Sequence, residues 1–476
     1  MSKKWLFQLT ALSLVLALVL AGCSGNNGGK GNAASPSSGA SDAGQTSPAA
    51  SSEDSGNGEK VTIRINLAIG EIFDEQIAEF EAAHPNIHVE RVDSDFNKLM
   101  SQIAAKSEIT PDIFRLFGAS EFPFYASRGL ALDLQPYFDK SEIFKQDDLL
   151  DATNIFRWDG KVSGQGDIYG FPKDWAPDFN LFINKKLFEE AGIPIPSDKQ
   201  SLTWEQVMEY AKKLTKKNGE KVEQWGLYDP LGGGVAMNQD LMLAQLASLG
   251  QSLYSADNSS IVLDTPEAKK VMQYWIDAVQ APVGPSALHT EALNFIDLFS
   301  QDKLGMMIVG YWFSGMLRTN ELTKNHLDDF VMLPAPIMEG GKRVEATRSG
   351  TGGIIYSGTK HPNEAWTVFE WFYGAKPAED RAKGGWGVPG FKSRIELLPQ
   401  ETNFDKQTHS IIVDDLKNLT TLPYNPYMSA MSLGTILDKY MTPVYFGKDT
   451  LDGAIEKVTK EVNIQIQENK DIVGAK

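Results

Sequence analysis

The sequence is poor in the residues that build disulfides and metal sites. Its 476 residues contain one cysteine, Cys23, and six histidines. A single cysteine excludes an intrachain disulfide and any zinc site made of several thiolates. Only His84 and His88 share a metal-like spacing, and Pro85 between them disfavours a common helical face. We therefore expect no metal and no cofactor.

An excess of positive charge is also missing. Lys and Arg number 45 against 62 Asp and Glu, a formal net charge of −17. A surface with this balance repels polyanions, so nucleic acid is excluded as a partner. The hydrophobic content of 42% still supports a large core, and the length allows two large lobes or about three domains.

The common catalytic motifs are absent. The chain contains no Gly-x-Ser-x-Gly elbow, no Gly-x-x-x-x-Gly-Lys phosphate loop and no His-Glu-x-x-His. Acid pairs such as Asp93 with Asp95, or Asp414 with Asp415, are typical of a solvated face in so acidic a chain. We expect no catalytic residue. A glycosidase, which needs two carboxyl groups across a sugar, remains the enzymatic alternative.

The N-terminus has the pattern of a secretory signal. Lys3 and Lys4 precede an apolar run over Trp5–Leu20, and Leu-Ala-Gly stands directly before Cys23. A membrane-spanning anchor is the alternative, because the run nearly reaches bilayer length. The position of the cysteine resembles a bacterial lipobox, which implies removal of residues 1–22 and a lipid on Cys23.

A low-complexity segment follows. Residues 24–60 are mostly Gly, Ser, Ala, Asn and Pro, without an aromatic or large aliphatic side chain. Such a composition predicts a disordered tether over 23–60, whose mean reach is on the order of 35 Å.

The globular part opens with a β-α-β-α-β pattern. Strands are predicted over 61–67, 87–92 and 111–117, with helical spacing between them. This order is typical of a parallel sheet, in which ligands bind at the carboxyl ends of strands. We expect ligand contacts in the loops that follow these strands, at 68–71, 93–95 and 117–121.

Motifs along the rest of the chain resemble extracellular solute-binding protein family 1, the sugar-binding lipoproteins of ABC importers that include maltose-binding proteins. The order and spacing of these segments together carry the resemblance, over Val61–Lys476: Thr110–Phe114, Gly129–Tyr137, Asp167–Pro172, Phe182–Pro194, Thr203–Glu205, Gly305–Ile308 with Trp312, and Lys360–Trp366.

The resemblance implies an α/β, two-lobe, type II binding-protein fold. Each lobe would hold a mainly parallel sheet flanked by helices, with crossing segments as a hinge. The implied lobes are 61–174 with 355–416, and 175–353 with 417–476.

Sugar sites combine aromatic rings, which stack on C–H faces, with charged or amide groups that bind hydroxyls. By resemblance and by position in loops, we expect ligand contacts from these residues, each with a core or solvated role as the alternative: Glu71, Phe117, Ser120, Glu121, Asp174, Trp175, Asp178, Trp312, Trp386 and Tyr427. Trp275, Trp366 and Trp371 lie on apolar helical faces and are predicted core residues.

Together these features predict a monomeric receptor, lipid-anchored through Cys23 to the outer face of a cell membrane of Gram-positive type. It would capture a carbohydrate, we expect an oligosaccharide, and deliver it to an ABC permease. The alternatives are a surface glycosidase, an adhesion or sensor module without a permease, and a receptor for a peptide, polyamine or osmolyte on the same fold.

Overall fold

Two five-stranded sheets organise the protein. The computed structural model describes residues 60–67, 70–92, 96–348 and 350–474, and Gly58–Lys476 form one compact unit. The first sheet confirms the three strands predicted at the start of the globular part. Its strands are β1 (Val61–Asn66), β2 (Ile87–Val92), β3 (Ile113–Phe117), β6 (Gly170–Pro172) and β12 (Thr351–Ile355).

The first sheet is mixed. Its order is β2-β1-β3-β12-β6, with β1 parallel to β2 and β3. β12 runs antiparallel to both β3 and β6. The expected parallel arrangement therefore holds for the first three strands only, because β12 enters this sheet directly from the second one.

The second sheet is mixed as well. Its order is β11-β7-β10-β9-β8, and only β9 and β10 are parallel neighbours. A short antiparallel pair, β4 (Arg157–Trp158) with β5 (Asp167–Ile168), stands apart from both sheets. The strands of the second sheet are β7 (Leu181–Asn184), β8 (Lys216–Asn218), β9 (Lys221–Tyr228), β10 (Leu304–Ile308) and β11 (Phe330–Leu333).

Helices connect and cover the strands. They are α1 (Asp74–Ala83), α2 (Phe96–Ala104), α3 (Gly118–Ser127), α4 (Gln135–Phe138), α5 (Lys185–Glu190), α6 (Trp204–Leu214), α7 (Gln239–Ser248), α8 (Pro266–Gln280), α9 (Phe295–Ser300), α10 (Phe313–Thr319), α11 (Pro362–Gly374), α12 (Lys376–Gly384), α13 (Asn403–Asp415), α14 (Ala430–Tyr445) and α15 (Leu451–Gly474). Four 3₁₀ turns complete the described elements: η1 (Asp151–Phe156), η2 (Leu327–Asp329), η3 (Lys392–Leu397) and η4 (Leu416–Asn418).

Local sequence explains where several helices begin and end. A capping box begins α6, with the backbone N–H of Gln206 donating to Thr203 Oγ1 at 3.2 Å. The Thr265 side chain caps α8 by accepting from the backbone N–H of Ala268, and Gly192 follows α5 with a φ of 65°. None of the described helices is both long enough and apolar enough to cross a membrane.

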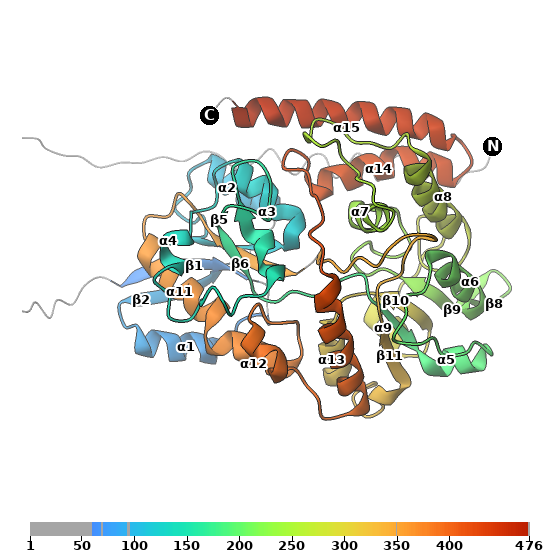
Figure 1. The fold of residues 1–476 in the computed structure, drawn as a ribbon, viewed down its shortest axis with the longest axis horizontal. Helices are drawn as coiled ribbons and strands as arrows, with labels where there is room; N and C mark the ends of the chain where they lie inside the picture. Colours follow the sequence, from blue (N-terminus) through green and yellow to red (C-terminus); the bar gives the residue numbers. More distant parts are fainter. Residues whose placement is uncertain (1–59, 68–69, 93–95, 349, 475–476) are drawn as a thin grey trace, which may run out of the picture. The chain divides into compact units, whose positions relative to one another are not determined.

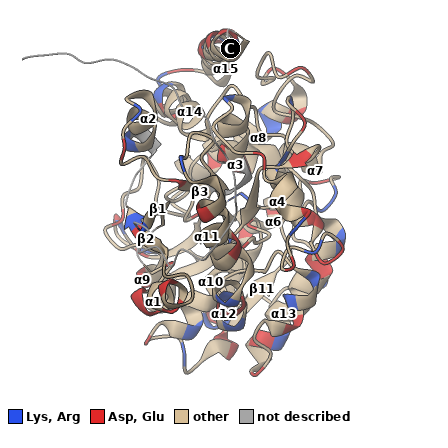
Figure 2. Ribbon diagram, turned by 90° about the vertical axis from the view of Figure 1, so that its left-hand side faces the viewer, with Lys and Arg blue, Asp and Glu red and all other residues tan. Residues whose placement is uncertain are grey.

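Apolar packing joins each sheet to its helices. α1 contacts β2, and α11 contacts β1 and β12, as Figure 1 shows for the first sheet. α6 packs on β9, and α13 packs on β11 through Phe404, Ile411 and Ile412. The predicted lobe boundary at 416 assigns α13 to the first lobe, whereas its core contacts lie on the second sheet. Figure 2 shows acidic residues on α1, among them Asp74 and Glu75 in its first turn.

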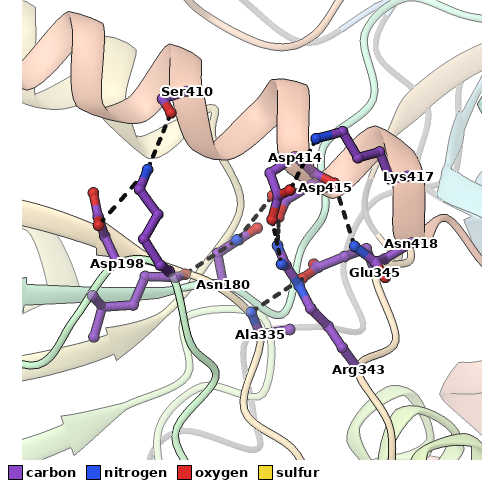
Figure 3. Close-up of polar contacts among 12 residues, drawn as sticks. Asn180, Asp198, Ala335, Arg343, Glu345, Ser410, Asp414, Asp415, Lys417 and Asn418 are labelled. Atoms are coloured by element: carbon purple, nitrogen blue, oxygen red, sulfur yellow. Dashed lines mark hydrogen bonds and ion pairs between the residues drawn. The ribbon is translucent and has the colours of Figure 1, made fainter.

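Three segments pass between the sheets: residues 173–180, 334–350 and 385–402. The second of them is tied to the C-terminal end of α13 by a cluster of charged side chains (Figure 3). Arg343 in this segment binds Glu345, Asp414 and Asp415, and Asn180 donates to Asp415 Oδ2 at 3.1 Å. Burial raises the pKa of both Glu345 and Asp415, although Arg343 opposes that effect.

Two adjacent glycines in β12 owe their place to close packing. A Cβ on Gly352 would lie 2.3 Å from the Phe156 ring, and one on Gly353 would lie 2.0 Å from Tyr373 Oη. β12 can therefore fit between these aromatic side chains only because its residues here lack a side chain.

Candidate functional site

A cavity of about 670 Å³ opens where chain segments of both sheets meet. Gly70 and Glu71 follow β1, Leu231 follows β9 and Trp312 follows β10. This is the strand-end position that the β-α-β pattern predicts for a ligand. Its described lining consists of Gly70, Glu71, Phe73, Gln76, Arg115, Lys173, Asp174, Leu231, Trp312, Thr351, Pro377, Asp380, Arg381, Gly384 and Trp386.

Four charged side chains form a balanced group in this lining. Glu71 binds Arg115 Nε at 2.6 Å and Lys173 Nζ at 2.8 Å. Lys173 Nζ also lies 2.9 Å from Asp174 Oδ2, and the Thr351 hydroxyl donates to the other oxygen of Asp174 at 3.1 Å. Two positive and two negative groups thus neutralise one another, which leaves directional hydrogen-bonding groups without a strong net charge.

Electrostatics keep Glu71 ionised. Burial of the carboxylate opposes ionisation, but Lys173 and Arg115 outweigh it and lower the pKa of Glu71 below its usual value. Arg381 lies nearby with its guanidinium 4.6 Å from the centroid of the Phe372 ring, and burial lowers the pKa of Arg381 to about 10. Both groups remain charged at neutral pH.

Two tryptophans supply aromatic surface. Trp386 is 42% exposed, and Trp312 is half-buried with its indole N–H donating to Asp178 Oδ1 at 3.2 Å. Phe295 contacts the Trp312 ring edge-on, with the centroids 6.4 Å apart. Exposed rings beside hydrogen-bonding groups match the two surfaces of a sugar.

Glycines bring the Trp386 loop close to α10. Gly385 ends α12 in the left-handed region, with a φ of 67°. The Gly385 carbonyl accepts from the Ser314 hydroxyl at 3.4 Å, and a Cβ on Gly315 would lie 3.1 Å from the Trp386 ring. The lack of a side chain at Gly315 therefore allows Trp386 to lie against the helix that Trp312 begins.

Four of the residues expected at the ligand site line this cavity: Glu71, Asp174, Trp312 and Trp386. Asp178 is fully buried and does not line it, although it bonds to Trp312. Trp175 is 1% exposed, pairs with Val388 through two backbone hydrogen bonds, and donates its indole N–H to the Pro389 carbonyl. It borders a second cavity of about 300 Å³ beside Thr347 and Thr420.

The other expected residues lie elsewhere or are only partly described. Ser120 is buried and Glu121 half-buried in α3, and neither is among the lining residues. Tyr427 is half-buried, with Lys470 Nζ 5.5 Å from its ring centroid. Phe117 is described only as the last backbone position of β3. Cys23, the predicted signal and the tether lie outside the described residues.

Sequence patterns missed several cavity residues. Lys173 directly precedes Asp174, so the motif Lys-Asp-Trp contained a signal for it. Arg115 is a charged residue between apolar neighbours of β3, which also marks an unusual position. Phe73, Leu231 and Arg381 have no comparable local signal, because only the tertiary structure brings their segments to the cavity.

The protein has two mixed β-sheets flanked by helices, and crossing segments join them beside the cavity. This α/β architecture is that of a type II binding protein. Residues 65–379 match the family model described as bacterial extracellular solute-binding protein, and the chain belongs to this family. Its members are solute-binding proteins of ABC transporters. No curated protein matches the chain at a significant level.

Solved structures share the fold at low sequence identity. An ABC substrate-binding protein of Listeria monocytogenes in complex with cycloalternan has a TM-score of 0.69 at 22% identity, covering 86% of this chain and 99% of its own. A solute-binding protein of Thermotoga lettingae with α-D-tagatose has a TM-score of 0.67 at 18% identity, with coverages of 86% and 100%. The sugar-binding protein MalE of Xanthomonas citri has a TM-score of 0.64 at 18% identity, with coverages of 87% and 100%.

Proposed function

We propose that this solute-binding protein captures a neutral oligosaccharide and delivers it intact to an ABC permease. One observation carries the proposal: Trp312 and Trp386 border the same cavity as the balanced group of Glu71, Arg115, Lys173 and Asp174. Aromatic rings suit the apolar faces of sugar rings, and paired charges suit their hydroxyl groups. The volume of about 670 Å³ falls within the range of small-molecule sites.

The solved structures support the sugar as ligand class. The Listeria protein holds cycloalternan, the Thermotoga protein holds a tagatose, and the Xanthomonas protein is described as sugar-binding. The lining adds a physical argument against a strongly charged ligand such as a polyamine, because each of the four central charges already faces an opposite one.

Capture would proceed by movement at the crossing segments. A ligand that contacts both sheets in a closed arrangement, but only one sheet in an open arrangement, binds the closed arrangement more tightly. The difference between the two affinities sets how strongly the ligand favours closure. Trp312 and Leu231 follow strands of the second sheet, whereas Glu71 follows β1 and Arg115 lies in β3 of the first sheet. An oligosaccharide in contact with all four would therefore stabilise the closed arrangement.

Lipid attachment at Cys23 belongs to the same proposal. The Leu-Ala-Gly-Cys pattern supports it, and residues 24–60 would hold the receptor near its permease. Replacing Cys23 by Ser should abolish the incorporation of radiolabelled palmitate into the protein in growing cells. Equal labelling of the variant and the wild type would contradict a lipid anchor at this cysteine.

A thermal-shift screen of the purified protein tests the ligand class. Mannotriose, cycloalternan and maltotriose are compared with peptides and spermidine at equal concentration. A ligand at 100 times its Kd adds about 2.7 kcal/mol of stability, which gives a clear rise in Tm. A shift with peptides or spermidine and none with any sugar would overturn the proposal. Mass spectrometry of the recovered sugar should show it uncleaved; a cleaved product would indicate a glycosidase.

A further inference from the structure

The indole of Trp312 is hydrogen-bonded to the buried carboxylate of Asp178, which does not line the cavity. Its indole Nε1 donates to Asp178 Oδ1 at 3.2 Å. Trp312 is half-buried and lines the cavity, whereas Asp178 has no exposed surface. Since a ring can turn about its side-chain torsions, a bond at one ring atom restricts the plane that the indole presents.

The second oxygen of the same carboxylate binds a crossing segment. Asp178 Oδ2 accepts the Thr347 hydroxyl at 3.1 Å and the backbone N–H of Arg348 at 2.8 Å. The backbone N–H of Asp178 also donates to the Ala346 carbonyl at 2.9 Å. Asp178 therefore joins the 173–180 and 334–350 crossing segments to each other and to the cavity tryptophan.

The local backbone leaves room for this arrangement. Gly310 stands between β10 and α10, where a Cβ would lie 2.3 Å from Asp178 Oδ1 and 2.7 Å from the Ala176 side chain. Any larger residue would displace the carboxylate, so glycine at this position is a condition for the bond to Trp312.

We propose that Asp178 is a positioning residue that sets the orientation of Trp312 for sugar stacking and couples it to the crossing segments. This inference rests on the proposed function, since it treats Trp312 as a ligand contact. The carboxylate touches no ligand and acts through the indole. Because one carboxylate serves both the ring and the segment at Thr347 and Arg348, movement at the hinge changes the support of Trp312.

Replacing Asp178 by Asn separates the two bonds. An amide has one acceptor oxygen and one donor NH₂ group, whereas the site presents donors on both sides. The oxygen satisfies two donors if it faces Thr347 and Arg348, and the NH₂ group then opposes the Trp312 indole N–H. We expect Asp178→Asn to release Trp312 while keeping most of the bonds at the crossing segment.

The test combines a ligand-free readout with affinity. Protein labelled with ¹⁵N at the tryptophan indole nitrogens is used, and Trp312→Phe assigns the Trp312 resonance. In Asp178→Asn we expect this resonance to shift upfield and its N–H to exchange faster with solvent. The Kd for the best sugar of the thermal-shift screen should rise about tenfold, because the indole plane is no longer fixed for stacking on the sugar.

Three further variants make the result specific. Gly310→Ala should give the same spectral change, because its Cβ displaces the carboxylate. Thr347→Val should leave the Trp312 resonance of the free protein in place. Asp302→Asn is the matched control, because Asp302 pairs with Lys186 away from the cavity; it should change neither readout.

An unchanged Trp312 resonance in Asp178→Asn and Gly310→Ala would overturn the inference, as would a shifted resonance with an unchanged Kd. The free-protein spectra require no sugar. If no sugar binds the wild type, the proposed function fails by itself, while the spectra still show whether Asp178 holds the indole.

Discussion

Arg348 and Asp229 form a bidentate ion pair that is withdrawn from solvent. Arg348 Nη1 donates to Asp229 Oδ2 at 3.1 Å, Nη2 bonds to the other oxygen, and the two side chains are 0% and 1% exposed. The pair attaches the 334–350 crossing segment to the residue that follows β9. The pair therefore holds this end of the 334–350 segment in place, and the proposed hinge movement involves that segment.

Replacing Asp229 by Asn should strongly destabilise the protein. The variant leaves the Arg348 charge buried without its main partner, which costs about 3–5 kcal/mol. Urea unfolding measures this free energy. Asp302→Asn provides the comparison, because the Asp302–Lys186 pair is partly exposed and its loss should cost less than about 1 kcal/mol. Equal effects of the two substitutions would contradict the importance of burial at Asp229.

Stability should depend on pH through Asp240. Burial raises the pKa of this carboxyl to about 6, although Arg348 and the Tyr424 hydroxyl, which donates at 2.9 Å, oppose it. Asp229 and Asp178 add to the increase. The folded protein then binds more protons than the unfolded chain between about pH 4 and pH 6, so this group makes stability fall as pH rises through that window.

Asp240→Asn isolates that contribution. The variant stays neutral at every pH, and its oxygen can still accept from Tyr424. Its free energy of unfolding, minus that of the wild type, should increase between pH 4 and pH 6 and stay level above. Chemical denaturation at each pH gives both values. A difference that does not change across this window would show that Asp240 keeps its ordinary pKa.

Trp386 and Trp175 should respond in opposite ways to replacement by Ala. Trp386 is 42% exposed, so its loss should change stability little but weaken sugar binding about tenfold. Trp175 is 1% exposed, and its loss should cost about 3–5 kcal/mol of stability. Calorimetric titration and urea unfolding measure the two effects. Unchanged binding by Trp386→Ala would remove this ring from the site.

Glu71→Gln should reduce sugar affinity about tenfold at neutral pH, because it removes a charged hydrogen-bond acceptor and disturbs Arg115 and Lys173. Since the pKa of Glu71 is lowered, wild-type affinity should persist as the pH falls to the usual pKa of a glutamate and decline only below it. Titration calorimetry between pH 3 and pH 7 measures both. Glu81→Gln on α1, outside the cavity lining, is the matched control.

The fold was largely predictable where local patterns are strong. Alternation of apolar residues located β1 and β2. Strand direction was not predictable from the same patterns, because a residue pattern of period two is identical in parallel and antiparallel strands. β12 thus joins the first sheet in the antiparallel sense, which only its route from the second sheet decides.

The candidate site was also predictable only in part from the sequence. Trp386 was expected at the ligand site from its position in a loop, and it lines the cavity. Trp175 and Asp178 were expected to touch the ligand but lie buried among the crossing segments. A sequence shows that a residue is aromatic or acidic and lies near a strand end; it does not show which side of the crossing its side chain faces.

The order of motifs by itself determined the family, the α/β class and the type of ligand to be expected, because those depend on local patterns along the chain. Only the tertiary structure decided that Glu71 meets Lys173 and Arg115, and that Asp178 supports Trp312. These contacts join segments up to 134 residues apart in the sequence. Their geometry follows from how the sheets and crossing segments pack, which no local pattern encodes.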